Sequence, residues 1–148
     1  MWFSKSKSIP ETEVPFFVWS SEEHSVGVTV FDQEHERLVT LMGQIHATVQ
    51  EKHDRALAQN LMESLIHQTQ AHFEHEESVM DNIEFPEREA HVAEHAALIQ
   101  QAKELLQKVQ NGGISALAIP NFLKSWLIPH MQIMDRKYAA AMRRHGLR

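Results

Sequence analysis

The chain of 148 residues is long enough for one domain with a single core and too short for two. Its 20 acidic and 14 basic residues give a formal charge of −6, and no Lys/Arg cluster indicates a nucleic-acid surface. We expect a cytoplasmic protein, because the sequence has no apolar run of transmembrane length and no apolar secretory-signal core before Pro10. Cysteine is absent, which excludes disulfides and thiolate ligands, whereas 11 histidines are unusually many.

Residues 1–28 show little hydrophobic periodicity, so we interpret them as an irregular N-terminal arm. The apolar run at 15–19 is expected to lie against the rest of the protein, and residues 29–148 are expected to form a single helical domain. The first helix is predicted at about 29–52, where apolar residues recur at three- and four-residue steps. These residues are Phe31, Leu38, Leu41, Met42, Ile45 and Val49.

A second helix is predicted from Asp54, a favourable N-cap, to about Met80. Pro86 is expected in the first turn of a third helix, which continues to about Val109. The sequence Asn-Gly-Gly at 111–113 then ends this helix, because glycine terminates helices at little cost.

The fourth helix is predicted over about 115–143, with Pro120 near its start and a bend at the interior Pro129. No segment of useful length alternates apolar and polar residues as a strand does. Four helices with short connections predict an all-α protein, an up-down-up-down four-helix bundle with an irregular N-terminal arm.

Several polar residues occupy positions where the core of a bundle needs apolar ones. Residues four apart share one helix face, whereas residues five apart are about 140° apart and are expected to approach a site from two flanks. When the chain is folded at turns near 54, 84 and 113, these residues lie at nearly equal heights. We therefore expect seven side chains to converge in one layer: His35, His72, Glu76, His91, His95, His130 and Asp135.

Buried imidazoles and carboxylates without partners cost several kcal/mol each, so such a layer needs something to bind. Imidazole and carboxylate donors without thiolate favour iron, manganese or zinc. Seven donors are too many for one tetrahedral ion and suit two six-coordinate ions that share bridging carboxylates. The alternative is a metal-free bundle with scattered surface histidines.

The motifs around these residues resemble the hemerythrins of bacteria. They are Ser25–Val28, Asp32–His35, His72–Glu77, His91–His95 and Trp126–His130 with Asp135, and the resemblance covers about residues 19–138. It implies a non-haem di-iron site with a bridging oxo or hydroxo group. By motif match His91, His95 and His130 would hold one iron, His35 and His72 the other, and Glu76 and Asp135 would bridge both.

The resemblance implies reversible O2 binding, as a bound (hydro)peroxide at the five-coordinate iron, for oxygen transport, storage or delivery and without enzymatic turnover. The alternative is an O2 sensor or scavenger, or a di-iron enzyme acting on nitric oxide or peroxide. The expected partners are O2 and a protein for oxygen delivery or sensing. Nucleic acid and membranes are not expected partners.

The same match implies an apolar O2 pocket formed by Leu38, Phe73, Trp126, Leu127 and Met131. Ordinary core packing is the alternative for each residue, above all for Trp126. Tyr138, one turn after Asp135, is a candidate for orienting a ligand. Two residues depart from the family pattern: Pro129 directly precedes a proposed ligand, and Met131 replaces the branched aliphatic residue common in relatives.

Two other metal-site classes can be compared with the sequence. Ferritin-type di-iron bundles use Glu-x-x-His pairs, and no histidine here has glutamate three residues before it. The metalloprotease motif His-Glu-x-x-His is also absent. The remaining six histidines are not expected to be ligands: His24, His46, His53, His67, His75 and His145.

Overall fold

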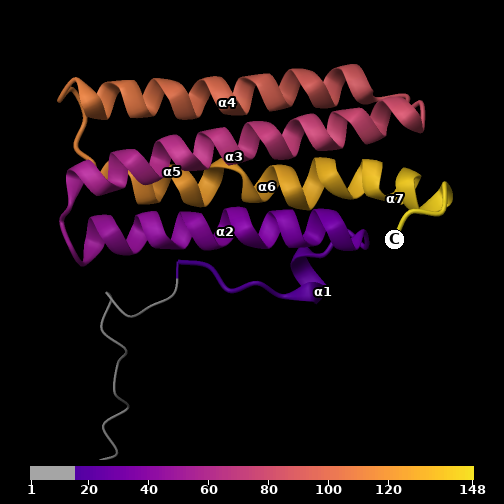
Figure 1. Ribbon diagram of the computed structural model, residues 1–148, viewed down its shortest axis with the longest axis horizontal. Coiled ribbons are helices and arrows are strands. Elements are labelled where there is room, and N and C mark those ends of the chain that lie inside the picture. The colour runs from indigo at the N-terminus through magenta and orange to yellow at the C-terminus, as the bar shows by residue number, and fades with distance from the viewer. Residues whose placement is uncertain (1–15) are drawn as a thin grey trace, which may run out of the picture.

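The computed structural model describes residues 16–148, which form helices and turns without any strand. Three long helices and a fourth, segmented limb run back and forth as a four-helix bundle (Figure 1), which confirms the all-α prediction. The elements are α1 (Ser21–His24), α2 (Thr29–Gln50), α3 (Arg55–Asn82), α4 (Arg88–Gln110), α5 (Ala118–Trp126), α6 (Ile128–His130), the π-helical turn η2 (Met131–Asp135) and α7 (Arg136–Arg144).

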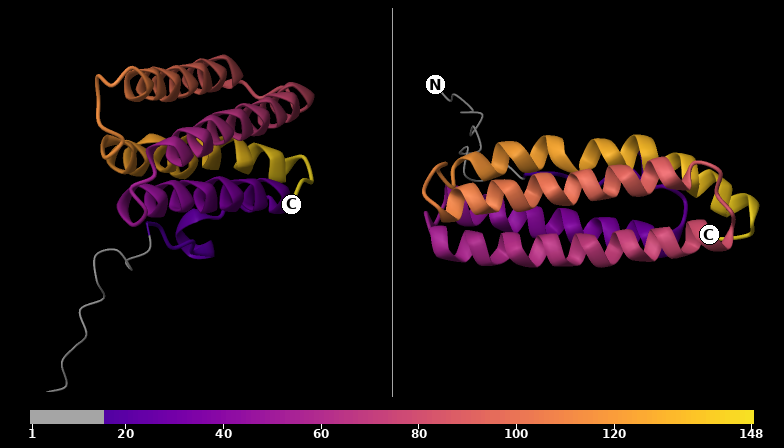
Figure 2. Two further views of the ribbon diagram at one scale, coloured as in Figure 1. Left: turned by 60° about the vertical axis from the view of Figure 1, so that its left-hand side comes forward. Right: turned by 90° about the horizontal axis from the view of Figure 1, so that it is seen from above.

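Each limb of the bundle packs against a limb next to it in the chain, and the fourth limb also packs against the first and second. Helix α2 contacts α3 and α5, and α3 contacts α4 and α7. The two further views in Figure 2 show the elongated bundle that results, with the connections at its two ends. No helix between residues 16 and 148 is both long and apolar enough to cross a membrane.

The ends of the long helices follow their sequence signals closely. The Asp54 carboxylate accepts the backbone N–H of Leu57 at 3.0 Å, as expected of the N-cap of α3. Helix α4 ends at Gln110, and Gly112, two residues later, has a φ of +77°, the left-handed conformation that favours glycine. There Gly113 N–H donates to Lys108 C=O at 2.9 Å and closes the end of the helix.

Helix α4 begins at Arg88, so Pro86 lies in the preceding turn and not in the first helical turn as expected. In this turn Arg88 N–H donates to Phe85 C=O at 3.2 Å, and the first helical bond follows, from His91 N–H to Glu87 C=O. Helix α4 thus begins two residues after Pro86, and not at the proline. A proline fits a tight turn before a helix as well as the first turn of the helix itself.

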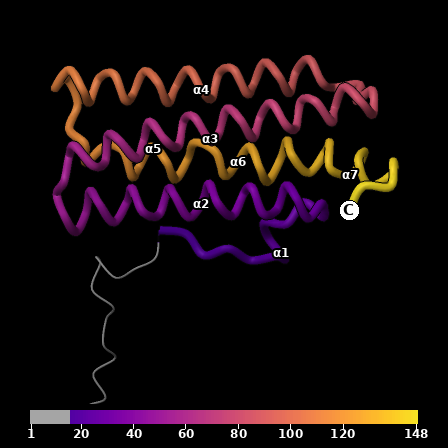
Figure 3. The backbone as a smooth tube through the Cα atoms, viewed as in Figure 1, coloured from indigo at the N-terminus to yellow at the C-terminus, as the bar shows by residue number. Residues whose placement is uncertain are grey.

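The N-terminal arm is described only from residue 16, and the expectations for residues 1–15 lie outside the described part. Figure 3 shows the visible part running beside α2 and reversing at α1, a short helix that was not expected. Phe16 and Phe17 pack against the core, whereas Val18 is 68% exposed. The Arg143 guanidinium donates to Val26 C=O and ties the arm to α7.

The fourth limb is not the single bent helix that was expected. It is interrupted at Leu127, between α5 and α6, and continues through the π-helical turn into α7. Pro129 has no N–H to donate to the carbonyl four residues before it, which is consistent with the interruption there. Pro120 lies in the first turn of α5, near the start of the limb as predicted.

Two apolar clusters fill the bundle, one on each side of a polar layer. The larger cluster includes Leu38, Phe73 and Met131, and the smaller includes Phe31 and Met80. On α2 His35 lies between Phe31 and Leu38, and on α3 Glu76 lies between Phe73 and Met80. Apolar packing thus closes the polar layer from both directions along the bundle.

Candidate metal centre

The polar layer contains all seven side chains that the sequence analysis brought together. None is more than 4% exposed. They come from α2, α3, α4, α6 and η2, so every limb of the bundle contributes. The residues are His35, His72, Glu76, His91, His95, His130 and Asp135.

These side chains divide into two overlapping groups, each with donor atoms within 4.8 Å of one another. One group has three histidines and the other has two, and both carboxylates belong to both groups. The three-histidine group is Glu76, His91, His95, His130 and Asp135, and the two-histidine group is His35, His72, Glu76 and Asp135.

Glu76 turns one carboxylate oxygen to each group. Its Oε1 lies 2.5 Å from His72 Nε2 and 3.4 Å from His35 Nε2. Its Oε2 lies 3.2 Å from His95 Nε2 and 3.8 Å from His91 Nε2. A carboxylate placed in this way can bind two ions at once, one through each oxygen.

Asp135 is divided between the groups in the same manner. Its Oδ2 lies 3.1 Å from His35 Nε2 in the two-histidine group. Its Oδ1 lies 3.0 Å from His91 Nε2 and 3.0 Å from His130 Nε2 in the three-histidine group. The two carboxylates therefore connect the same pair of positions.

His130 and Asp135 approach the layer from one face of the fourth limb, not from two flanks as expected. The expectation assumed α-helical winding, in which five residues overshoot one turn. The structure has a π-helical turn at Met131–Asp135, which accommodates one more residue per hydrogen-bonded turn. Asp135 consequently returns to the side of His130.

The donor atoms fit metal ions better than they fit one another. Five of the Nε2 and carboxylate oxygen atoms in the layer have no hydrogen-bond partner within residues 16–148, and the short approach of His72 Nε2 to Glu76 lacks hydrogen-bond geometry. Leaving such atoms unpaired is costly, and a cation in each group would satisfy them. They are His72 Nε2, His95 Nε2, His130 Nε2, Glu76 Oε2 and Asp135 Oδ2.

Three further glutamates hold the outward nitrogens of the histidines. Glu34 accepts from His72 Nδ1 at 2.6 Å, Glu77 from His95 Nδ1 at 3.0 Å, and Glu94 from His130 Nδ1 at 2.9 Å. A proton on Nδ1 leaves Nε2 bare and directed at the layer, which is the tautomer a metal ligand needs.

The sequence analysis did not identify Glu34, Glu77 or Glu94. A usable signal existed, because metal-binding histidines usually donate their second ring N–H to a carboxylate or a carbonyl. Each glutamate directly adjoins a layer residue in sequence: Glu34 precedes His35, Glu77 follows Glu76, and Glu94 precedes His95. Each nevertheless holds a histidine of another helix, and this pairing becomes visible only when the helices are packed.

Neighbouring carboxylates favour the protonated imidazoles of His72 and His130 in the absence of metal. Burial lowers the pKa of His72, but Glu76 and Glu34 outweigh burial and raise it to about 10. Burial likewise lowers the pKa of His130, and Asp135 and Glu94 raise it to about 9. Cations are therefore favoured at these nitrogens, whether as protons or as metal ions.

The two shared carboxylates remain ionised in this environment. Burial and the neighbouring Glu76 raise the pKa of Asp135, but hydrogen bonds from His130, His35 and His91 hold it below the ordinary value of 3.8. Burial raises the pKa of Glu76, and His72, His35 and His95 bring it well below 4.5. Both residues can therefore act as anionic ligands over the physiological pH range.

Tyr138 lies fully buried beside the layer, and its hydroxyl has no hydrogen-bond partner among residues 16–148. Its ring centroid is 4.9 Å from that of His91 and 5.9 Å from that of Phe31. Burial, followed by the charges of Glu76 and Asp135, raises the pKa of Tyr138 well above 10. The side chain therefore stays a neutral phenol that packs against one of the histidines.

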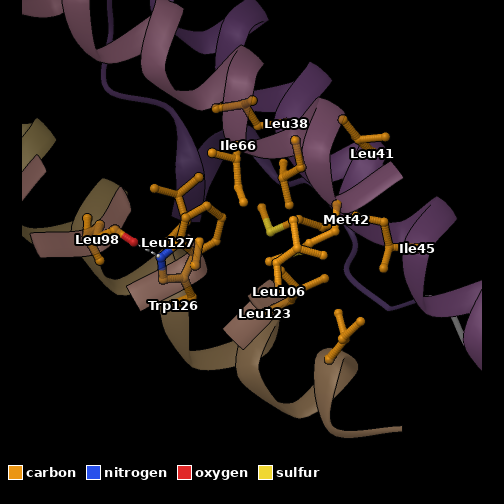
Figure 4. Packing of buried hydrophobic residues seen from close by; sticks show 14 of the residues in the cluster. Leu38, Leu41, Met42, Ile45, Ile66, Leu98, Leu106, Leu123, Trp126 and Leu127 are labelled. Carbon is orange, nitrogen blue, oxygen red and sulfur yellow. Dashed lines mark hydrogen bonds between the residues drawn. The ribbon is translucent and has the colours of Figure 1, made fainter. Parts of the chain in front are cut away.

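The five apolar residues expected around an O2 pocket are all buried in the larger cluster. Phe73 has the most direct relation to the layer, since its ring stacks on His95 and lies within 5.9 Å of the ring of His72. Figure 4 shows Leu38, Leu127 and Trp126 among the packed side chains of this cluster.

Trp126 also makes a polar contact that the sequence did not indicate. Its indole Nε1–H donates to the Leu98 carbonyl at 2.9 Å, drawn as a dashed line in Figure 4. This bond connects α5 to α4 across the bundle. It gives Trp126 a structural role in addition to its apolar packing.

The six histidines that were not expected to be ligands lie outside both groups of donor atoms in the described part of the chain. His24 is buried beside the rings of Phe17 and Trp19. His67 is exposed on α3. His75, also on α3, hydrogen-bonds to Glu34 at 2.7 Å.

Comparison with known proteins identifies the family. Residues 26–142 match the model of the hemerythrin HHE cation binding domain. The chain belongs to the hemerythrin family. The matched range includes all seven residues of the layer and ends within α7.

Named relatives of the hemerythrin family cover most of this chain. Bacteriohemerythrin of Stenotrophomonas maltophilia is 27% identical over 86% of this chain and 82% of its own length. Bacteriohemerythrin of Aquifex aeolicus is 30% identical over 72% of this chain and 80% of its own length. A crystal structure of wild-type hemerythrin has the same fold, with a TM-score of 0.77 and 24% identity over 84% of this chain and 96% of that one.

Proposed function

We propose that the buried layer holds two iron ions and that the protein binds O2 reversibly, for oxygen transport, storage or delivery. The observation that carries the proposal is the division of Glu76 and Asp135, each of which directs one oxygen to each group of histidines. Two carboxylates arranged in this way are suited to bridging a pair of ions. Membership of the hemerythrin family supports iron as the metal.

The proposed ligands are unequally distributed. His91, His95 and His130 would hold one ion and His35 and His72 the other, with Glu76 and Asp135 shared. The two-histidine position would thus receive one protein ligand fewer and is the position proposed to accept O2. Ferrous ions held there would supply the electrons that reversible O2 binding requires.

The residues of the chain would contribute geometry and exclusion of water. Glu34, Glu77 and Glu94 fix the Nδ1 atoms of three ligands, so that their Nε2 atoms face the metals. Leu38, Phe73, Leu127 and Met131 are at most 4% exposed and would keep water from the open position. No side chain is needed as a general acid or base for binding and release.

Absorption spectra of the iron-loaded, anaerobically reduced protein test this function. The spectrum is recorded before O2, after O2 and after purging with argon, with zinc-loaded protein as a redox-inert control. We expect a charge-transfer band that appears with O2 and disappears under argon in the iron-loaded protein alone. Prompt, irreversible oxidation would contradict a carrier role and indicate a scavenger or an oxidising enzyme.

A further inference from the structure

A chain of two hydrogen bonds connects the surface of α3 to the metal layer. The imidazole of His75 donates from Nδ1 to Glu34 Oε2 at 2.7 Å. The other oxygen of the same carboxylate, Oε1, accepts from His72 Nδ1 at 2.6 Å. The Nε2 atom of His72 lies in the two-histidine group, so His75 is two hydrogen bonds away from a proposed ligand.

Glu34 differs from the other two outer glutamates in this respect. Across residues 16–148, the hydrogen bonds of Glu77 and Glu94 each reach a single imidazole, His95 and His130 respectively. Glu34 is held at both oxygens, by His72 and by His75. The doubly held carboxylate serves the position that has fewer protein ligands, where the orientation of each remaining ligand matters most.

His75 is itself held in place, although its side chain is 43% exposed. Its ring lies 4.8 Å from the ring of Phe31, measured between centroids. Phe31 is 1% exposed and also contacts the rings of His72 and Tyr138. The His75 ring therefore packs on one side against a buried residue of the smaller apolar cluster.

Water can reach the Glu34 carboxylate from a surface pocket of about 270 Å³ that Glu34, His72 and His75 line together. A long side chain at such a place can exchange one of its hydrogen bonds for water and change its rotamer. The bond from His75 occupies the oxygen that water would otherwise take. It therefore favours the rotamer in which Glu34 also accepts from His72.

We propose that His75 is a positioning residue for the two-histidine metal position. By holding Glu34, it keeps the proton of His72 on Nδ1 and directs His72 Nε2 at the metal. The inference rests on the proposed function to the extent that the layer must hold two ions. It requires no change in the charge of His75.

Cobalt(II) titration under argon tests this role without O2 chemistry, because visible absorption follows the binding of each equivalent. Wild type is expected to bind two equivalents, and His72→Ala identifies which step belongs to the two-histidine position. For His75→Ala we expect that step to weaken by about three- to tenfold, less than the loss of a direct partner of a ligand typically causes. The step at the three-histidine position is expected to stay unchanged.

Two matched variants separate positioning from general damage. Asparagine can place an amide N–H near the position of His Nδ1, so His75→Asn is expected to restore the wild-type affinity. His67→Ala removes an exposed histidine from the same helix and is expected to change neither step. Circular dichroism spectra verify that all variants keep their helices.

Three results would overturn the inference: wild-type affinity in His75→Ala, equal weakening of both steps, or no recovery in His75→Asn. If wild type binds fewer than two equivalents, the two-metal proposal itself is wrong and the role of His75 falls with it. A failure of the inference alone leaves two equivalents in wild type. The two failures are therefore distinguishable.

Discussion

Phe73 lies flat against the imidazole of His95, with ring centroids 3.7 Å apart and planes inclined by 3°. Phe73 follows the proposed ligand His72 on α3, and His95 lies on α4, so this one contact joins two helices at the edge of the polar layer. The phenyl ring belongs to the larger apolar cluster and covers one face of the imidazole. It both orients a proposed ligand and fills space that water would otherwise occupy.

Truncating this ring is expected to affect stability and O2 retention together. Phe73→Ala should lower the free energy of unfolding by about 3–5 kcal/mol, the usual cost of such a cavity. Phe73→Leu fills most of the space and should cost about 1 kcal/mol. Guanidinium denaturation measures these costs, and the decay of the O2-dependent absorption band should accelerate in the same order. A decay as slow in Phe73→Ala as in wild type would show that the ring does not protect the site.

Removing one ligand of the two-histidine position is expected to abolish O2 binding. His72→Ala deletes one of the two imidazoles proposed to bind this ion. The Nε2 atom of His72 also lies 2.5 Å from Glu76 Oε1. Spectra of the reduced, iron-loaded variant should show no band that O2 produces and argon removes. The exposed His67→Ala on the same helix serves as the control. Normal O2 binding by His72→Ala would show that the ligand assignment is wrong.

Protein stripped of metal is expected to lose stability as the solution becomes alkaline. The folded-state pKa of His72 is about 10 and that of His130 about 9, both above the ordinary 6.5. Raised pKa values stabilise the folded state fully below pH 6.5, and this contribution disappears as pH rises through 9 and 10. Denaturation midpoints of the chelator-treated protein should therefore be lower at high pH than near pH 6.5.

The same pKa values predict how metal binding responds to pH. Metal ions must displace the protons of His72 and His130, so binding should release protons and become tighter as pH rises. Calorimetry in buffers of different ionisation enthalpy measures the released protons. Metal affinity that does not vary between neutral and alkaline pH would contradict these pKa shifts.

The lowered pKa values of Asp135 and Glu76 act in the acid range, where the stability of the folded protein should fall as pH drops below their ordinary values.

Two glycines should respond oppositely to alanine. Gly27 has φ +80°, and a Cβ there would lie 2.7 Å from the Arg143 guanidinium, so Gly27→Ala should destabilise the protein by about 1–2 kcal/mol. Gly43 lies inside α2 with nothing within 4 Å of an added Cβ, so Gly43→Ala should stabilise it by about 0.5–1 kcal/mol. Thermal unfolding measures both. Adding Arg143→Ala should relieve the steric part of the Gly27 defect and leave the backbone strain.

The positions of the helices and of the polar layer were predictable because they depend on local end signals and on the number of residues between each ligand and the nearest turn. Asp54 and the glycines after α4 specify helix ends, and equal distances from the turns place His35 opposite His72. The π-helical turn was not predictable in this way. Its sequence looks like any amphipathic helix, and the extra residue is accommodated only when Asp135 must face the layer from the same side as His130.

The outer shell of the site was missed for a related reason. Glu34, Glu77 and Glu94 look like solvated charges in the sequence, and each has a partner on another helix. Their roles depend on side-chain direction across an interface, to which periodicity is insensitive. His75 is not expected to be a ligand and its side chain is 43% exposed, yet it is connected to His72 through Glu34.

The order of the ligands along the chain has a consequence for biosynthesis. Helices α2 and α3 carry His35, His72 and Glu76, which emerge from the ribosome before α4 and the fourth limb. A nascent α2–α3 hairpin would thus expose a partial, mononuclear site able to capture a stray cation. Asp135, which connects both groups, is synthesised last of the seven. Under the proposed function, assembly of the complete two-ion site would therefore have to wait for the fourth limb, which carries His130 and Asp135.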